Sequence, residues 1–134
     1  MRFGRLNIVV GAVMLLLGAL GGLLLGATFD AQSVKDGVHV LPLARFFVRE
    51  GHSHTMPFAL LNLCIGLLVD RLALSDGWKR TCSWLAVLAF VLPIGLEIRG
   101  LMGAPADFPP IPVLGVVGFI GAVALVAIGM RRAQ

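Results

Sequence analysis

Four long apolar stretches, separated by polar segments, take up most of this 134-residue chain. They cover residues 8–27, 51–69, 78–98 and 108–130. A helix of about 20 residues rises about 30 Å, which matches the hydrocarbon thickness of a bilayer. The pattern therefore predicts an all-α integral membrane protein, a bundle of four transmembrane helices in a single domain over residues 1–134.

Glycines recur every four residues on the first predicted helix, at Gly18, Gly22 and Gly26. Small residues at this spacing let a second helix approach closely. The stretch follows Arg2 and Arg5, as the apolar part of a secretory signal peptide would, but it is longer than the about 7–15 residues typical of one. We therefore expect a retained helix whose glycine face packs against a neighbour.

Residues 28–50 form a long polar connection between the first two predicted helices. Apolar and charged residues alternate in it around Phe46 and Phe47. An interfacial helix, a lid over a membrane site and a solvated loop each suit this alternation. The pattern leaves all three open, with the connection placed on the periplasmic or exterior side.

The composition agrees with lipid as the solvent. The chain is 58% hydrophobic and 13% charged, with a mean hydropathy of +0.96. Soluble proteins are roughly 45–50% apolar and about 25% charged. The net charge is +4, but the bases flank the apolar stretches and form no stripe with aromatic residues. Nucleic-acid binding is therefore not expected.

The basic residues also predict an orientation. If both termini lie on one side, that side holds seven bases: Arg2, Arg5, Arg71, Lys79, Arg80, Arg131 and Arg132. The other side holds four: Lys35, Arg45, Arg49 and Arg99. Cytoplasmic loops carry the excess of Lys and Arg. We therefore expect a multi-pass protein of the inner (cytoplasmic) membrane with both termini in the cytoplasm.

Three polar residues are predicted near one membrane face. The second helix starts at His52 and His54, and the third ends at Glu97, so the topology brings them to the same side. Neutral imidazole is a ligand for iron, copper and zinc, and polar groups inside a membrane are costly unless they serve a function. The cluster predicts a metal or haem site, although histidines bonded to lipid headgroups fit it as well.

Asn62 lies about 12 Å deeper in the membrane than His54. Its amide must find hydrogen-bond partners there. A bond between helices and a contact with a cofactor or substrate both remain open. Glu97 has the same ambiguity, because it can pair with Arg99 or act as a functional acid.

In its layout and in one motif the chain resembles the styrene oxide isomerases, small four-helix membrane proteins. His54-Thr55-Met56-Pro57 is similar to the His-Ser-Gly-Pro of their haem-ligand turn, and His52-Ser53 matches the His-Ser pair in a second register. Leu61-Asn62 resembles a Leu-Asn whose amide contacts substrate. That family binds haem b between the subunits of a trimer through one axial histidine, and its ferric iron acts as a Lewis acid on an epoxide oxygen.

The resemblance implies haem b held by His54 or His52, with Asn62 and Glu97 as catalytic contacts, in a homo-oligomer that acts on a small apolar substrate. The family's catalytic Tyr follows Gly-Phe on the third helix. This chain has no Tyr, and Gly95-Leu96-Glu97 stands in that place.

Two other functions fit the same residues. One is a non-enzymatic membrane subunit or assembly factor that binds copper through His52, His54 and Met56, since imidazole and thioether both suit copper. The other is a small transporter that uses Glu97 for proton coupling.

Overall fold

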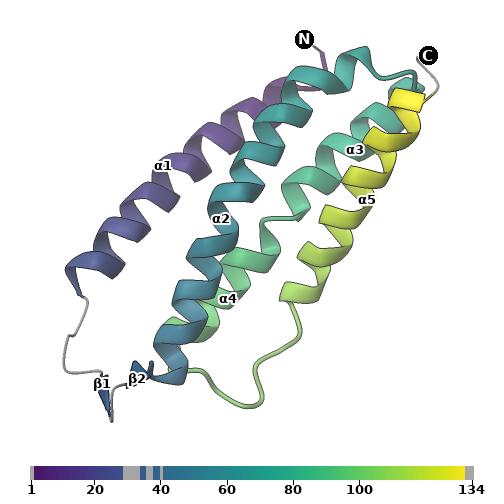
Figure 1. The fold of residues 1–134 in the computed structure, drawn as a ribbon. Helices are drawn as coiled ribbons and strands as arrows, with labels where there is room; N and C mark the ends of the chain where they lie inside the picture. The colour runs from purple at the N-terminus through teal and green to yellow at the C-terminus, as the bar shows by residue number, and fades with distance from the viewer. Residues whose placement is uncertain (1, 29–33, 36–37, 40, 132–134) are drawn as a thin grey trace.

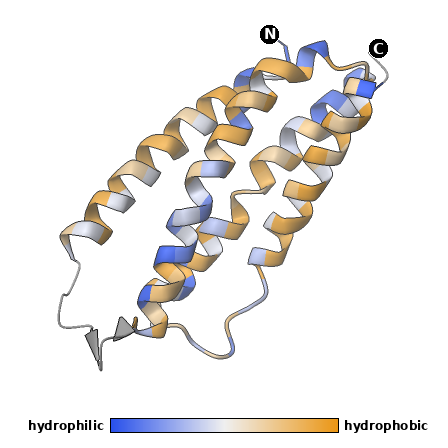
Figure 2. Ribbon diagram, in the orientation of Figure 1, coloured by the Kyte–Doolittle hydropathy of each residue, from blue (hydrophilic) through white to orange (hydrophobic). Residues whose placement is uncertain are grey.

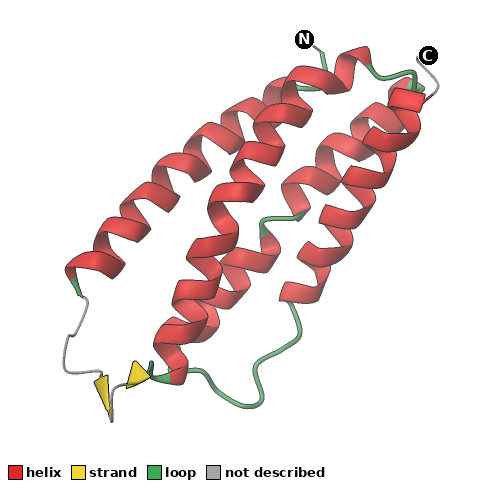
Figure 3. Cartoon of the chain, in the orientation of Figure 1, coloured by secondary structure: helices red, strands yellow, loops and turns green. Residues whose placement is uncertain are grey.

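The computed structural model describes residues 2–28, 34–35, 38–39 and 41–131. Among these residues, the regular elements are helices apart from a pair of two-residue antiparallel strands, β1 (Val34–Lys35) and β2 (Val38–His39) (Figure 3). The helices are α1 (Arg5–Ala27), α2 (Leu43–Leu68), α3 (Asp76–Leu88), α4 (Val91–Leu101) and α5 (Pro112–Arg131), and a 3-10 turn, η2 (Val69–Arg71), follows α2 (Figure 1).

Four helical stretches are long and apolar enough to cross a membrane: Arg5–Ala27, Leu43–Arg71, Asp76–Leu101 and Pro112–Arg131. This confirms the predicted all-helical chain with four segments able to span a bilayer. Apolar positions cover most of α1 and α5, whereas hydrophilic positions interrupt α2 in the half nearest the strands (Figure 2). That half of α2 holds the predicted site.

The second helix is longer than predicted. It begins at Leu43, after Pro42, rather than at residue 51. Its first turns pack against α4, because a methyl group added at Gly100 would lie 2.5 Å from Val48 Cγ2 and from the Ala44 carbonyl oxygen. Arg45, Arg49 and Glu50, whose charges suggested a connection, therefore sit on a packed helix. Residues 29–33, 36–37 and 40 of the predicted connection lie outside the described residues. Pro57 lies inside α2.

The third predicted span, residues 78–98, is two helices in the structure. α3 ends at Leu88 and α4 begins at Val91. Pro93 has no N–H to bond the Ala89 carbonyl, and the N–H of Leu92 donates to that carbonyl instead at 3.1 Å. The break gives α4 its own direction. The fourth span begins at Pro112 rather than at residue 108.

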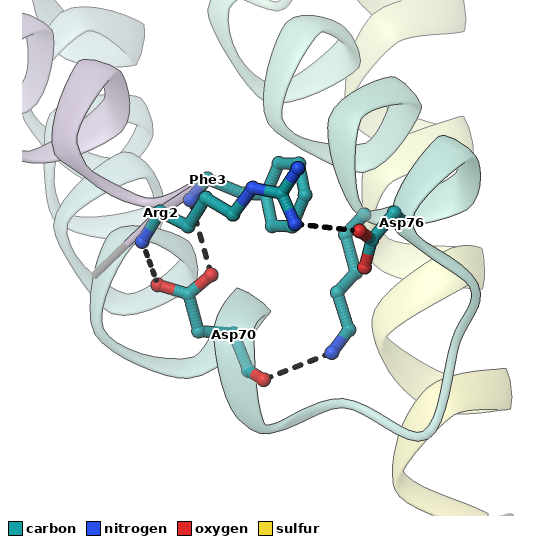
Figure 4. A network of polar contacts seen from close by, with 5 residues as sticks. Arg2, Phe3, Asp70 and Asp76 are labelled. Atoms are coloured by element: carbon teal, nitrogen blue, oxygen red, sulfur yellow. Dashed lines mark hydrogen bonds and ion pairs between the residues drawn. The ribbon is translucent and has the colours of Figure 1, made fainter.

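Both ends of the bundle can be followed in Figure 1: the described chain starts and finishes at one end, and the strands lie at the other. At the terminal end, the Asp70 carboxylate accepts hydrogen bonds from the backbone N–H groups of Arg2 and Phe3 at 2.8 and 3.0 Å. The Arg2 guanidinium pairs with Asp76 at 2.8 Å, and Lys79 donates to the Asp70 carbonyl at 2.9 Å (Figure 4). These contacts tie the start of α1 to η2 and α3.

Small residues bring the helices together elsewhere. α1 packs on α2, α2 on α4, and α5 on α3 and α4. A methyl group at Gly18 would lie 2.8 Å from Met56 Sδ, and one at Gly22 would lie 2.9 Å from His52 Cε1. The predicted glycine face of the first helix therefore does pack closely against α2, except at Gly26, which has no neighbour within 4 Å.

Candidate functional site

A cavity of about 530 Å³ lies between α1, α2 and α4, in the half of the bundle nearest the strands. Its walls are mostly apolar. They include Met14, Leu17, Leu24 and Leu25 from α1 and Ile94 and Leu101 from α4. The polar groups in its lining are Thr28, His52, Thr55 and Glu97. An apolar hollow with a few convergent polar groups is the usual form of a small-molecule site.

His52 enters the cavity because α1 has no side chain opposite it. A methyl group at Gly22 would lie 3.1 Å from His52 Nε2, and one at Gly21 would lie 3.5 Å from Nδ1. The Nδ1 atom is buried and has no hydrogen-bond partner among the residues that the structure describes. Buried polar atoms in proteins nearly always have a partner. This nitrogen therefore lacks the partner that a buried polar atom ordinarily has, and it belongs to a residue of the cavity lining.

Glu97 and Thr55 lie next to His52. The Glu97 carboxyl lies near both the His52 imidazole and the Thr55 hydroxyl, and that hydroxyl also donates to the Gly51 carbonyl at 3.0 Å. Gly51 makes this possible, because a methyl group there would overlap the Glu97 side chain and lie 2.6 Å from the Pro93 carbonyl oxygen. The close approach of α2 and α4 thus places an acid and an imidazole at one apolar surface.

His54 does not line this cavity. Two residues along a helix turn the side chain by about 200°. Its Nδ1 lies 2.7 Å from the Glu50 carbonyl oxygen, and its ring meets Phe58 edge-on at 6.1 Å. Phe58 in turn stacks on Phe119 of α5 at 5.1 Å. The structure therefore brings His52 and Glu97 together and leaves His54 on another side of α2.

Asn62 also lies outside the lining of the cavity. Its amide oxygen accepts from Asn7 at 2.9 Å, and its nitrogen donates to the carbonyls of Phe58 and Ala86 at 3.1 and 2.8 Å. Asn7 donates to the Ser83 carbonyl at 2.9 Å and accepts from the Ser83 hydroxyl. The arrangement matches the alternative of a bond between helices, and it satisfies the amide of Asn62.

Two arginines, Arg45 and Arg99, lie at the strand end of the site. Arg45 donates to the Leu25 carbonyl at 2.7 Å and to the Thr28 hydroxyl at 3.3 Å, and both acceptors belong to residues of the cavity lining. Arg99 lies over the Phe47 ring at 4.2 Å and donates to the Pro105 carbonyl at 3.3 Å. Within the described residues, Arg99 forms no ion pair with Glu97.

The described ranges contain no group of three or more His, Cys, Asp or Glu side chains that could hold a metal ion between them. A haem iron requires only a single axial side chain, and histidine is a frequent one. The chain was compared with protein families, with curated proteins and with solved structures, and none of them matches it.

Proposed function

We propose that this chain is a membrane protein that binds haem b through His52 and acts on a small apolar oxygenated molecule. The buried, unpartnered Nδ1 of His52 at the edge of an apolar cavity is the observation that carries the proposal. The resemblance to the styrene oxide isomerases supplies the identity of the cofactor and the class of reaction. The unpartnered Nδ1 favours His52 over His54 as the ligand.

The residues around His52 fit a flat apolar macrocycle. The cavity beside the imidazole is walled by apolar side chains of α1 and α4. Gly21 and Gly22 let the imidazole lie directly against the α1 backbone. Leu17, Leu24 and Leu101 are 52%, 66% and 78% exposed, so the cavity opens sideways toward lipid. A group larger than the cavity can extend through that opening and contact a second copy of the chain, in the homo-oligomer that the resemblance implies.

Haem b, when bound, would supply a ferric Lewis acid that polarises a substrate oxygen. The chain's own residues account for the other requirements. Glu97 can accept or donate a proton at the cavity surface, in the place where the resembling family has a Tyr. The leucine walls exclude water, which strengthens electrostatic interactions within the site. An isomerisation needs one substrate only, which suits a single small cavity.

His54 is the alternative ligand. Metal-bound histidines usually donate their second N–H to a carboxylate or a backbone carbonyl. The Nδ1 of His54 lies 2.7 Å from the Glu50 carbonyl, so its Nε2 is the nitrogen left for iron. Such a haem would sit outside the cavity, on the surface of α2.

A visible spectrum of the purified protein tests the proposal. The protein is expressed with excess haem, extracted in mild detergent, and compared with His52→Ala and His54→Ala, each checked for helix content. We expect a Soret band that His52→Ala removes and His54→Ala keeps. The reverse result assigns the iron to His54. A colourless wild-type protein, or a band that survives in both variants, would overturn the proposal.

A non-enzymatic membrane subunit is the second candidate, because α1 and α5 leave many large apolar side chains exposed. Leu23 is 70% exposed and Ile120 is 60% exposed. The copper variant of this function needs His52, His54 and Met56 together, and only His52 and Met56 contact the glycine face of α1. Copper retained by haem-free protein, and lost in Met56→Leu, would favour this function over haem binding.

A further inference from the structure

A second hollow, of about 530 Å³, lies on the surface of α3 and the start of α4. Its lining forms one stripe along the helix, with Arg80 at one end and Val91 at the other, and Trp84 and Leu88 between them. The stripe ends where the chain steps sideways from α3 to α4 (Figure 1). The hollow is therefore an elongated groove with a cation at the terminal end of the bundle and apolar walls beyond it.

We propose that this groove binds one anionic phospholipid, with the phosphate at Arg80 and one acyl chain along the stripe to Val91. The length of the groove is the first argument. Eleven residues separate its ends, a rise of about 16 Å, and this is close to half of the about 30 Å hydrocarbon core. One leaflet, and therefore one extended acyl chain, spans about this half.

The charges at this end are the second argument. Arg2 is paired with Asp76, and Lys79 is bonded to the Asp70 carbonyl. Arg80 forms no ion pair within the described residues and lies exposed at the mouth of the groove. Trp78 and Trp84 are 54% and 60% exposed, and tryptophans concentrate at the boundary between headgroups and acyl chains. The groove therefore offers a cation at headgroup level and an apolar wall at the level of the acyl chains.

Tryptophan fluorescence in lipid vesicles tests the proposal. The chain has two tryptophans, so Trp78→Phe leaves Trp84 as the only one. This variant is reconstituted in vesicles of unlabelled phosphatidylcholine that contain a small fraction of brominated lipid, either phosphatidylglycerol or phosphatidylcholine with the same acyl chains. We expect brominated phosphatidylglycerol to quench Trp84 several-fold more strongly than brominated phosphatidylcholine does.

Two variants, each made in the Trp78→Phe background, complete the test. Arg80→Gln should bring quenching by brominated phosphatidylglycerol down to the phosphatidylcholine level. Arg131→Gln removes an exposed base at the same end on α5 and should change nothing. Equal effects of the two variants would show general attraction of anionic lipid and overturn the site. Absence of quenching by either brominated lipid would show that a second copy covers the groove, and would overturn it too.

Discussion

Asn7 of α1 donates a hydrogen bond of 2.9 Å to Asn62 of α2, and both residues are completely buried. The side-chain amide of Asn7 also bonds to Ser83 of α3: it donates to the Ser83 carbonyl and accepts from the Ser83 hydroxyl. Three helices thus meet at one polar cluster, at a depth where water cannot replace a lost partner. The cluster lies toward the terminal half of the bundle, away from the cavity that holds His52.

Replacing Asn62 with Leu should destabilise the fold and leave ligand binding intact. The change removes the acceptor of Asn7 and the donor to the Ala86 carbonyl. A buried polar group left without a partner costs about 1–3 kcal/mol. Unfolding in mixed detergent measures this loss, with Ser53→Ala as the exposed control. A variant of normal stability that loses haem or substrate affinity would make Asn62 a site residue after all.

Alanine substitutions of two α1 glycines should affect haem binding differently, depending on whether the glycine contacts His52. Gly22→Ala places a methyl group 2.9 Å from His52 Cε1, so the ring must shift. We expect haem affinity to fall about tenfold or more, equivalent to at least about 1.4 kcal/mol. A haem titration followed by the Soret band measures the affinity, and it is repeated with Gly26→Ala, which has no neighbour within 4 Å. That control should bind normally and gain up to about 1 kcal/mol of helix stability.

Gly118→Ala should weaken the packing of α5 against α3. The added methyl group would lie 2.7 Å from the Leu85 carbonyl oxygen and 2.8 Å from the Ala89 nitrogen. Backbone atoms cannot move aside as a flexible side chain can, so we expect a loss of about 1–3 kcal/mol. Thermal unfolding provides the measurement. Gly77→Ala, which has open space around it, should not lower the melting temperature.

Glu97→Gln should separate binding from chemistry. The amide keeps the size of the carboxyl but cannot accept a proton as a base. If Glu97 is the general acid–base, the rate of isomerisation of an epoxide should fall by about 100-fold or more. The Soret band and the haem content should stay unchanged, because the proposed ligand is His52. A variant with full activity would leave Glu97 with a structural role only.

The four membrane segments could be predicted from the sequence because each is a long apolar run. The start of α2 could not, because the prediction required a stretch free of charge. Arg45 and Arg49 sit on the first turns of α2, where the Ala44 carbonyl and the Val48 side chain pack against Gly100 of α4. An amphipathic turn at the end of an apolar helix becomes visible only once its partner helix is known.

The candidate site, too, could be predicted from the sequence only in part. The meeting of His52 with Glu97 followed from counting membrane crossings, whereas the separation of His52 from His54 depended on which side of α2 faces α1. Asn7 escaped notice because it follows Arg5 at the start of the first span, where an amide is common near headgroups. Its burial depends on Asn62 and Ser83, and these come from two other helices.

Because α2 is long, the thickness of the membrane should affect how the cavity at His52 is exposed. Its 26 residues rise about 39 Å, compared with about 30 Å of hydrocarbon. The helix must either lean in the bilayer or project beyond it at the Leu43 end. In a thinner bilayer the opening of the cavity would lie at the level of the headgroups. In a thicker bilayer it would lie within the hydrocarbon. Hydrophobic mismatch would thereby set how easily water and polar solutes reach His52.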